Sequence, residues 1–285
     1  MTTAGVVTHH DREIAWALAR DGIEWLLERG HDVRLPKPDA ERVGVPDLAC
    51  EPDELIPGLD VLIGIGGDGT ILRAVELAAD DDVPVLGVNA GQLGYLATVE
   101  PSSLRMAMKR FLAGSYEVEE RMRLALSIER SDGSVEQMST ALNEAVVERC
   151  DFGHTVRVEV SFDGRFFTSY VADGLIVATP TGSTAYAFSV RGPFIAPRHR
   201  AILLAPVSPH MLFDRSMVLE PTTEVRLQVS GHRHARLSVD GRDGGLLHDG
   251  DAVVCTAARH PARLVTFGHD VFHEVLRSKF HLADR

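Results

Sequence analysis

The residues best suited to chemistry lie within residues 61–73, where three glycines surround one carboxylate. The stretch reads Val-Leu-Ile-Gly-Ile-Gly-Gly-Asp-Gly-Thr-Ile-Leu-Arg. Gly66, Gly67 and Gly69 can adopt positive φ angles and let backbone N–H groups approach a ligand. A strand pattern precedes them and helical spacing follows, so the positive end of a helix favours phosphate here. A carboxylate repels phosphate oxygens, which indicates that Asp68 handles a proton or a metal ion.

The same stretch matches two common nucleotide-binding patterns incompletely. Residues 64–69 fit the dinucleotide fingerprint G-x-G-x-x-G, which also needs an acidic residue about 20 positions later. Here the next apolar run ends in Asn89. A Walker A loop needs lysine where Thr70 stands. An ordinary strand-to-helix turn is the remaining alternative, but such a turn rarely needs three glycines around one carboxylate.

The composition bounds the class of protein. The chain has 285 residues, 45% of them hydrophobic, and a net charge of -12. This length favours two domains, and the acidic balance argues against a nucleic-acid or anionic-membrane partner. The three cysteines form no C-x-x-C pair, which predicts reduced thiols and a cytoplasmic location. We find no apolar run long enough to span a membrane and no basic start typical of a signal peptide.

The elements that would position Asp68 alternate between strand and helix. We expect a strand at residues 4–8, a helix capped by Asp11 and closed by Gly30, and further strands near residues 33–35, 61–66 and 83–88. Residues 36–57 carry five prolines and predict an irregular surface connection. The last helix of this half of the chain is predicted to begin near Pro101 and end near Gly114. Residues 1–115 are therefore predicted to form an α/β domain with a parallel sheet.

The second half has a different pattern. Residues 116–267 offer short strands separated by turn signals, which predicts a mostly-β domain. The turn signals are at residues 131–133, 163–164, 240–241 and 249–250. Helical spacing returns in residues 268–285, and we expect this closing helix to return to the N-terminal domain.

Two further motifs follow the glycine turn in order. Asn143-Glu144 comes first, and then residues 173–186, Asp-Gly-Leu-Ile-Val-Ala-Thr-Pro-Thr-Gly-Ser-Thr-Ala-Tyr. Together with residues 61–73 this set resembles the NAD kinase family over most of the chain. Residues 87–95, 206–210 and 239–241 add weaker similarity.

The resemblance implies phosphoryl transfer from ATP or polyphosphate to the 2′-hydroxyl of the adenosine ribose of NAD, giving NADP. It also implies Mg²⁺, or another divalent cation, with the nucleotide. Asp68 would act as general base, since a secondary hydroxyl is a poor nucleophile until its proton is removed. Positioning and the cation would supply the rest of the rate. A lipid or sugar kinase with the same turn, and a non-catalytic NAD-binding sensor, remain alternatives.

The resemblance also implies binding roles for particular residues. Gly67, Gly69, Thr70 and Arg73 would hold the donor, although a solvated helix arginine explains Arg73 equally well. Asn143 and Glu144 would hold ribose hydroxyls; without the family they would be a polar pair at a strand edge. The remaining acceptor-binding residues are Asp173, Thr184 and Ala185 for adenine, with Tyr186 and Ser189 lining the cleft. Residues 181–184 also suit structural capping of a helix.

Several positions depart from the family pattern. Arg191 replaces a usual glycine, Arg242 a usual glutamine, and Val171 an arginine found in many members. His154 stands where a basic contact is often present. Arg242 and His154 are kept as binding candidates, and the preference between NAD and NADH stays open.

The other signals predict no metal site. His232 and His234 lack further ligands at metal-binding spacing, and His9-His10 is interpreted as the start of a helix. The family resemblance also implies a homodimer or homotetramer with contacts between β-domains.

Overall fold

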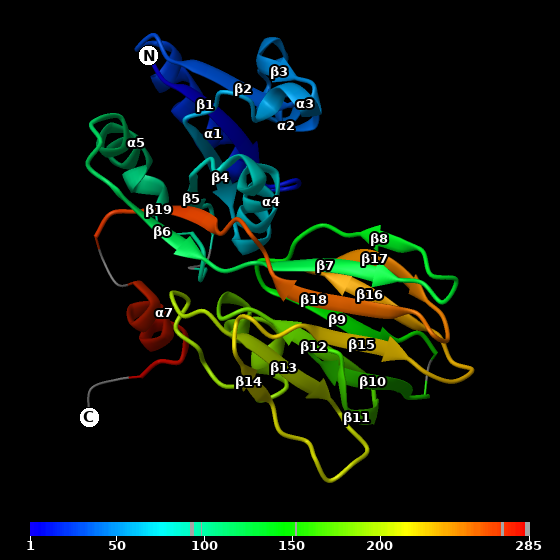
Figure 1. Cartoon of the computed structure of the whole chain (residues 1–285). Coiled ribbons are helices and arrows are strands. Elements are labelled where there is room, and N and C mark those ends of the chain that lie inside the picture. Colours follow the sequence, from blue (N-terminus) through cyan, green and yellow to red (C-terminus); the bar gives the residue numbers. More distant parts are fainter. Residues whose placement is uncertain (92–93, 98, 152, 269–270, 283–285) are drawn as a thin grey trace. The chain divides into compact units, whose positions relative to one another are not determined.

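The chain forms two compact units in the computed structural model (Figure 1), which describes residues 1–91, 94–97, 99–151, 153–268 and 271–282. Unit 1 comprises Met1–Glu120 and Ala262–Arg285, and unit 2 comprises Arg121–Pro261. Each unit has its own hydrophobic core. Within the described residues, no helix is both long and apolar enough to cross a bilayer.

Unit 1 is built on one seven-stranded sheet with the order β3-β2-β1-β4-β5-β19-β6. The pairs from β3 to β19 are parallel. The strands are β1 (Thr3–Thr8), β2 (Asp32–Pro36), β3 (Ala49–Cys50), β4 (Val61–Gly66), β5 (Val85–Asn89), β6 (Glu117–Arg121) and β19 (Ala262–Thr266). The predicted α/β domain with a parallel sheet is confirmed.

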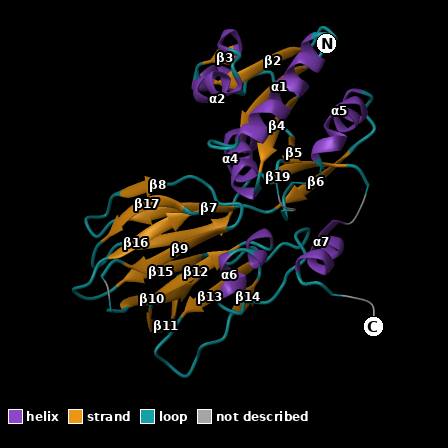
Figure 2. Cartoon of the chain, turned by 180° about the vertical axis from the view of Figure 1, so that it is seen from behind, coloured by secondary structure: helices purple, strands orange, loops and turns teal. Residues whose placement is uncertain are grey.

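Helices cover both faces of this sheet, as Figure 2 shows. On one face Ile63 and Ile65 share a core with α1 and α5. On the other face Gly64 lies under α4, where an added Cβ would come within 2.9 Å of the Ile71 side chain. The helices are α1 (Glu13–Leu27), α2 (Lys37–Val43), α3 (Pro52–Leu55), α4 (Asp68–Ala78), α5 (Leu104–Leu112) and α7 (Val271–Lys279), with short 3-10 turns η1 (Pro46–Leu48), η2 (Ala79–Asp81) and η3 (Pro101–Ser103).

Two local predictions in unit 1 were wrong. Asp11 does not cap α1, because the N-cap residue is Arg12 and its side chain makes no capping bond. The predicted irregular connection at residues 36–57 contains α2, η1, β3 and α3. Its prolines do not break these elements, since α2, η1 and α3 each carry a proline in the first two helical positions, where no intrahelical N–H bond is lost.

Unit 2 consists of two six-stranded antiparallel sheets, with the orders β11-β10-β15-β18-β7-β8 and β14-β13-β12-β9-β16-β17. The apolar side chains of both sheets form one core. The strands are β7 (Leu124–Glu129), β8 (Val135–Gln137), β9 (Glu144–Arg149), β10 (Val156–Phe162), β11 (Arg165–Ala172), β12 (Gly174–Ala178), β13 (Ile202–Val207), β14 (Met217–Leu219), β15 (Val225–Val229), β16 (Ala235–Val239), β17 (Arg242–Leu247) and β18 (Ala252–Ala257). The short helices η4 (Thr181–Thr184) and α6 (Tyr186–Ser189) follow β12.

Two of the predicted turns are tight hairpins. Both residues of Asp163-Gly164 and of Asp240-Gly241 have positive φ, as a two-residue hairpin of primed type requires. They connect β10 to β11 and β16 to β17. Aspartate and glycine therefore supply the backbone conformation that sets strand register in this unit.

The chain returns to unit 1 earlier than the sequence indicates. Residues 262–267 were assigned to the second domain, yet β19 lies beside β5 in the unit 1 sheet, with Leu264 opposite Val85. Their apolar strand pattern resembles that of unit 2, so it carries no sign of which sheet they join. Farther along, α7 contacts unit 1 through Lys279, whose ammonium lies 4.3 Å from the centre of the Tyr95 ring.

A buried hydroxyl in unit 2 gives a test of this packing. Tyr170 is fully buried and its hydroxyl has no hydrogen-bond partner among the described residues. Because an unsatisfied buried polar group destabilises the folded state, Tyr170→Phe should raise the free energy of unfolding by about 1 kcal/mol. Urea denaturation measures this, with Tyr116→Phe in unit 1 as control. Destabilisation by Tyr170→Phe would contradict the expectation.

Candidate functional site

The glycine turn joins the end of β4 directly to the first residue of α4. The N–H of Thr70 bonds the carbonyl of Gly67 at 2.9 Å, which begins the helix. The N–H groups of the first helical turn lack intrahelical partners and favour an anion. None of the three glycines uses the left-handed region that is open to glycine. Gly66 is instead required by close approach, because an added Cβ would lie 2.2 Å from the Thr70 hydroxyl.

The Asp68 carboxylate is fixed by two backbone N–H groups. Oδ2 accepts from Tyr95 and Oδ1 from Leu96, each at 3.0 Å. Gly94 makes room for it, since a Cβ on Gly94 would come within 2.0 Å of Oδ1. The neighbouring residues 92 and 93, which belong to the weaker motif at residues 87–95, lie outside the described residues. Asp68 is therefore held in one orientation at the carboxyl edge of the sheet.

Arg73 is bound to a buried acid. Its guanidinium donates to Asp39 through Nη2–Oδ2 at 2.6 Å and Nη1–Oδ1 at 3.1 Å. Asp39, on α2, is fully buried and also accepts from the backbone N–H and the hydroxyl of Thr8, both at 3.1 Å. The alternative of a simply solvated helix arginine was wrong, because this pair ties α4 to α2 and to the end of β1.

Sequence reasoning missed the amide of Asn89. This residue ends β5 opposite Gly66 and is 1% exposed. Its Oδ1 accepts the N–H of Gly91 at 3.0 Å, which orients the amide, and its Nδ2 has no partner among the described residues. A polar residue at the carboxyl end of a parallel strand is the signal that points to it.

In unit 2 the Asn143-Glu144 segment is organised by Asp240, which the sequence indicated only as part of a turn and of the weaker motif at residues 239–241. Its carboxylate accepts the backbone N–H groups of Leu142 and Asn143 at 2.8 Å and of Glu144 at 3.0 Å. On the other side, the Asn143 carbonyl accepts the N–H of Thr179 at 2.9 Å. The weak motif at residues 239–241 thus serves to position the stronger one.

Glu144 is buried and incompletely bonded. It is 7% exposed, and its Oε2 has no hydrogen-bond partner among the described residues. Burial, followed by the negative charge of Asp240, raises the pKa of Glu144 to about 8, against the opposing effect of the Tyr186 backbone N–H that it accepts. A buried carboxyl oxygen without a partner is suited to receive a hydroxyl from a ligand.

Asp173 and Tyr186 lie together in unit 2. Both line a cavity of about 280 Å³, whose other lining residues are Glu148, Arg149, Cys150, Gly174 and Val207. The Asp173 carboxylate pairs with Arg149 at 2.9 Å, and both remain about one-third exposed. The cavity is open to a polar ligand that competes for this ion pair.

The short helix at residues 181–184 is capped by a residue that precedes it, not by its own side chains. Neither η4 nor α6 has a side-chain cap, and the Thr179 hydroxyl accepts the Gly182 N–H at 3.1 Å. The Ser183 hydroxyl is buried and donates to the Pro180 carbonyl at 2.7 Å. Ser183 is therefore structural, whereas Thr184 and Ala185 stay half-buried.

The predicted residues divide between the units. Gly67, Asp68, Gly69, Thr70 and Arg73 belong to unit 1, and Asn143, Glu144, His154, Asp173, Thr184, Ala185, Tyr186, Ser189 and Arg242 belong to unit 2. Within unit 2, Tyr186 is near Glu144 and Asp173, and the charge of Arg242 acts on Asp240. His154 and Ser189 are exposed.

Comparison with known proteins decides the family. Residues 4–116 match the model of the ATP-NAD kinase N-terminal domain, and residues 142–267 match that of the ATP-NAD kinase C-terminal domain. The NAD kinase of Heliobacterium modesticaldum is 41% identical over 281 residues, 98% of each chain. The chain belongs to the NAD kinase family. The NAD kinase of Moorella thermoacetica is a further relative, 37% identical over 280 residues that cover 98% of this chain and 89% of its own.

Solved structures share the fold. Yeast NADH kinase complexed with NADH has a TM-score of 0.92 at 23% identity, covering 100% of this chain and 89% of its own. An NAD kinase from Archaeoglobus fulgidus in complex with ATP has a TM-score of 0.75 at 24% identity, covering 99% and 100%. NAD kinase membership makes the chain a kinase, and it decides against the lipid kinase, sugar kinase and sensor alternatives.

Arg191 departs from the NAD kinase pattern in an informative way. Its φ is 65°, the left-handed region that glycine adopts without strain and other residues adopt at a cost of roughly 1–2 kcal/mol. The backbone thus retains the conformation expected for the usual glycine.

Val171, the second departure, lies on strand β11, where its carbonyl accepts the His210 N–H at 2.7 Å.

The residues of unit 1 fit a hard divalent cation carried by a nucleotide. Mg²⁺ prefers oxygen ligands and usually combines one or two carboxylates with phosphate oxygens. The Asp68 carboxylate offers such oxygens, since each accepts one N–H and keeps a lone pair free.

Gly94 provides a test of this geometry. Gly94→Ala places a Cβ against the Asp68 carboxylate, so it should displace the carboxylate and lower kcat for NADP formation at least about 100-fold. The matched control is Gly91→Ala, whose Cβ meets only the flexible end of Arg12. Equal activities of the two variants in a coupled NADP assay would show that the close approach is unimportant.

Proposed function

We propose that this chain transfers the terminal phosphoryl group of ATP, or of polyphosphate, to the 2′-hydroxyl of the adenosine ribose of NAD. The observation that carries the assignment of roles is the Asp68 carboxylate, held by two backbone N–H groups beside a helix N-terminus. In this proposal Asp68 is the general base, and the N–H groups of the glycine turn, with Thr70, hold donor phosphates.

Asp68 removes the proton of the 2′-hydroxyl as the oxygen attacks the phosphoryl group. The bond to the terminal phosphorus forms while the bond to the leaving phosphate breaks. A positioned base contributes about 10²- to 10⁴-fold to the rate. When bound, Mg²⁺ neutralises charge on the phosphate oxygens. Arg73, whose guanidinium pairs with Asp39 at 2.6 Å, orients the helix and contributes positive charge next to the donor.

Unit 2 supplies the groups that hold NAD. The Oε2 of Glu144, which has no hydrogen-bond partner among the described residues, accepts a ribose hydroxyl, while the amide of Asn143 both donates and accepts. The cavity at Asp173 and Tyr186 takes the adenine end of the dinucleotide, with Thr184 and Ala185 nearby in sequence. Ser189, His154 and Arg242 complete the proposed set of binding residues.

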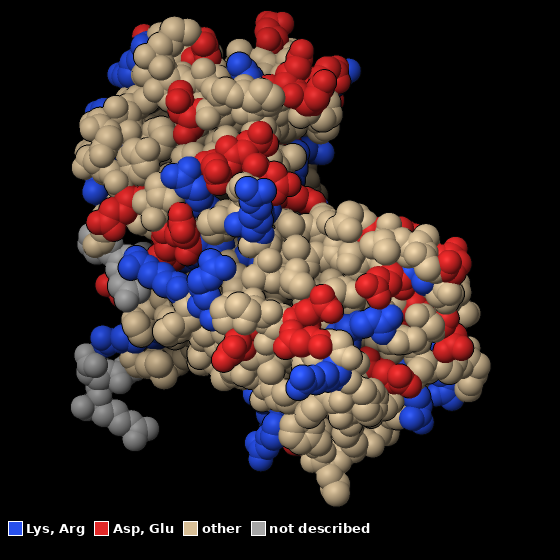
Figure 3. All heavy atoms as spheres, in the orientation of Figure 1, with Lys and Arg blue, Asp and Glu red and all other residues tan. Residues whose placement is uncertain are grey.

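The acidic surface of unit 1 supports the expectation that the chain binds neither nucleic acid nor an anionic membrane. On the face drawn in Figure 3, acidic side chains gather over the part of unit 1 that carries α2 and α3. Exposed acidic residues in this part of the chain are Asp47, Glu51, Asp53 and Glu54. Such a surface repels nucleic acids and anionic membranes. The free thiols of Cys50, Cys150 and Cys255 support a cytoplasmic location.

We also propose a homodimer or homotetramer with contacts through unit 2. The support is a set of exposed apolar side chains in unit 2, in which Leu212 is fully exposed and the rings of Phe167 and Phe213 lie 5.9 Å apart; Phe166 and Val218 are exposed as well. Surfaces of this kind mark association sites. Light scattering measures the mass of the assembly, and Leu212→Asp should reduce it, whereas a monomeric wild-type protein would refute this part.

Asp68→Asn tests the base. The amide keeps the shape of the side chain but cannot take the proton, so NADP formation should fall by about 10²- to 10⁴-fold while the dissociation constant for NAD changes only a few-fold. Purified protein is incubated with NAD, Mg²⁺ and either ATP or polyphosphate, and NADP is detected with a strictly NADP-dependent dehydrogenase. Asp81→Asn, on the exposed end of η2, is the control. Turnover of Asp68→Asn near that of the wild type would overturn the assignment.

Glu144 predicts a pH dependence of stability. Its pKa is raised from 4.5 to about 8, so the folded protein keeps a proton that the unfolded chain loses above pH 4.5. The free energy of unfolding should therefore decrease as pH rises from 4.5 to 8. Glu144→Gln cannot ionise and should be more stable than the wild type at pH 8, with a smaller difference at pH 5. Urea denaturation of both, with exposed Glu220→Gln as control, checks this.

The same carboxyl predicts the pH dependence of binding. A ribose hydroxyl donates to the ionised form, so NAD affinity should increase between pH 6 and pH 8. Glu144→Gln should weaken binding by about 10- to 100-fold, the value of a hydrogen bond to a charged group, and should remove the pH dependence. Isothermal titration with NAD in the absence of a donor measures both effects, and an unchanged pH profile in Glu144→Gln would contradict them.

A further inference from the structure

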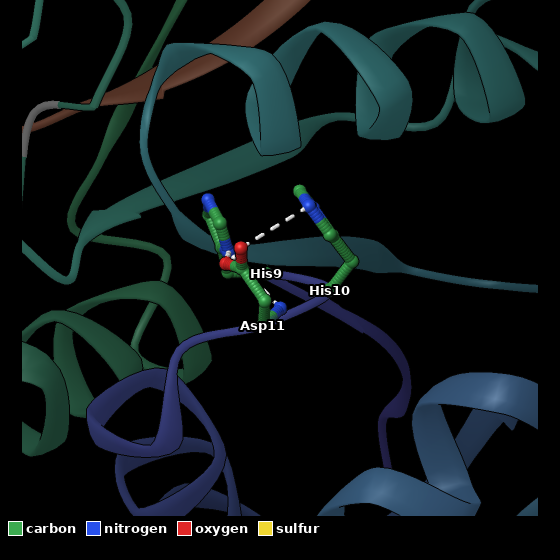
Figure 4. A group of neighbouring side chains, drawn as sticks. All are labelled: His9, His10 and Asp11. Carbon is green, nitrogen blue, oxygen red and sulfur yellow. Dashed lines mark hydrogen bonds and ion pairs between the residues drawn. The ribbon is translucent and has the colours of Figure 1, made fainter.

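Three metal-ligating side chains meet where β1 ends. The imidazole Nδ1 of His9 lies 2.7 Å from Oδ1 of Asp11, and Nε2 of His10 lies 3.5 Å from Oδ2. One ligand atom from each of the three residues can be chosen so that all lie within 4.8 Å of one another. Figure 4 shows both imidazoles pointing to the same side, with the carboxylate between them.

We propose that His9, His10 and Asp11 bind a divalent first-row transition metal ion, with Mn²⁺ and Zn²⁺ as the probes. Two imidazoles and one carboxylate form a 2-His-1-carboxylate set, which suits such ions and leaves coordination positions open. Imidazole disfavours Mg²⁺ relative to these metals, since Mg²⁺ prefers oxygen. The site is thus distinct in its chemistry from the oxygen ligands offered by Asp68.

Backbone hydrogen bonds hold His9 in place, whereas the side chains of His10 and Asp11 are exposed and can change conformation. The N–H of His9 bonds the Ile65 carbonyl at 3.0 Å, and its own carbonyl accepts Nε1 of Trp16 at 2.8 Å. The His9 side chain is 18% exposed, against 73% for His10 and 65% for Asp11. Zinc–ligand distances of about 2.0–2.2 Å therefore need only small movements of the two exposed side chains.

The place of the cluster indicates what fills the open positions. The hydrogen bond from the His9 N–H to the Ile65 carbonyl puts the cluster next to β4, the strand that leads into the glycine turn. Phosphate oxygens are anionic ligands, so we infer that the metal also contacts the terminal phosphates of the donor. This second step rests on the proposed function, whereas metal binding itself does not.

The first experiment measures metal alone. The full chain without a histidine tag is titrated with Mn²⁺ by electron paramagnetic resonance and with Zn²⁺ by calorimetry. Wild type should bind one ion, and His10→Ala or Asp11→Asn should weaken binding at least 10-fold, with an unchanged melting temperature. His232→Ala, an exposed histidine of unit 2, is the matched control. Equal affinities of wild type and His10→Ala, or equal losses in His10→Ala and His232→Ala, would overturn the site.

The second experiment separates this site from the catalytic proposal. Asp68→Asn should bind Mn²⁺ in the absence of nucleotide as tightly as wild type, even though it loses NADP formation. Loss of this binding would move the metal site to Asp68 and overturn the assignment. A non-hydrolysable ATP analogue should tighten Mn²⁺ binding in wild type more than in His10→Ala. An equal effect in both would overturn the contact with phosphate.

Discussion

Backbone N–H groups that hold buried or partly buried carboxylates are the interaction on which the candidate residues of each unit depend. Asp68 is fixed by the N–H groups of Tyr95 and Leu96, and Asp240 by those of residues 142–144. Asp39 is fixed at the end of β1 in the same way. Charge-assisted bonds of this kind are strong and directional. They fix loops that no regular hydrogen-bond ladder reaches, and so convert strand ends into a defined site.

The sequence predicts those parts of the fold that are local. The glycine turn lies between one strand and one helix that follow each other, and the Asp-Gly hairpins need only two residues, so periodicity and turn chemistry are sufficient. The parallel sheet of unit 1 and the mostly-β unit 2 follow from the same patterns. The prolines of residues 36–57 led to the wrong prediction of an irregular connection, because proline also occupies the first turn of helices.

The missed features depend on contacts between distant residues. Asp240 meets Leu142 across 98 positions, and Asp39 meets Arg73 across 34. No spacing rule links such residues, and aspartate after a strand is equally typical of a turn. The sequence showed Asn89 only as the lack of an acid and as part of the weaker motif at residues 87–95. Its buried Nδ2, which has no partner among the described residues, is apparent only in the structure. The glycines were predicted for their backbone freedom, whereas Gly66 and Gly94 matter for the space that they leave.

The place of β19 in the sheet has a consequence for biosynthesis. Unit 2 is one uninterrupted stretch, whereas the unit 1 sheet is completed only by residues 262–266. Until these emerge, β5 has an open edge and β6 lacks its neighbour, since β19 stands between them. At about 5–20 residues per second, the ribosome leaves that edge exposed for on the order of ten seconds. A nascent chain in this state is a natural client for a chaperone that shields unpaired strands.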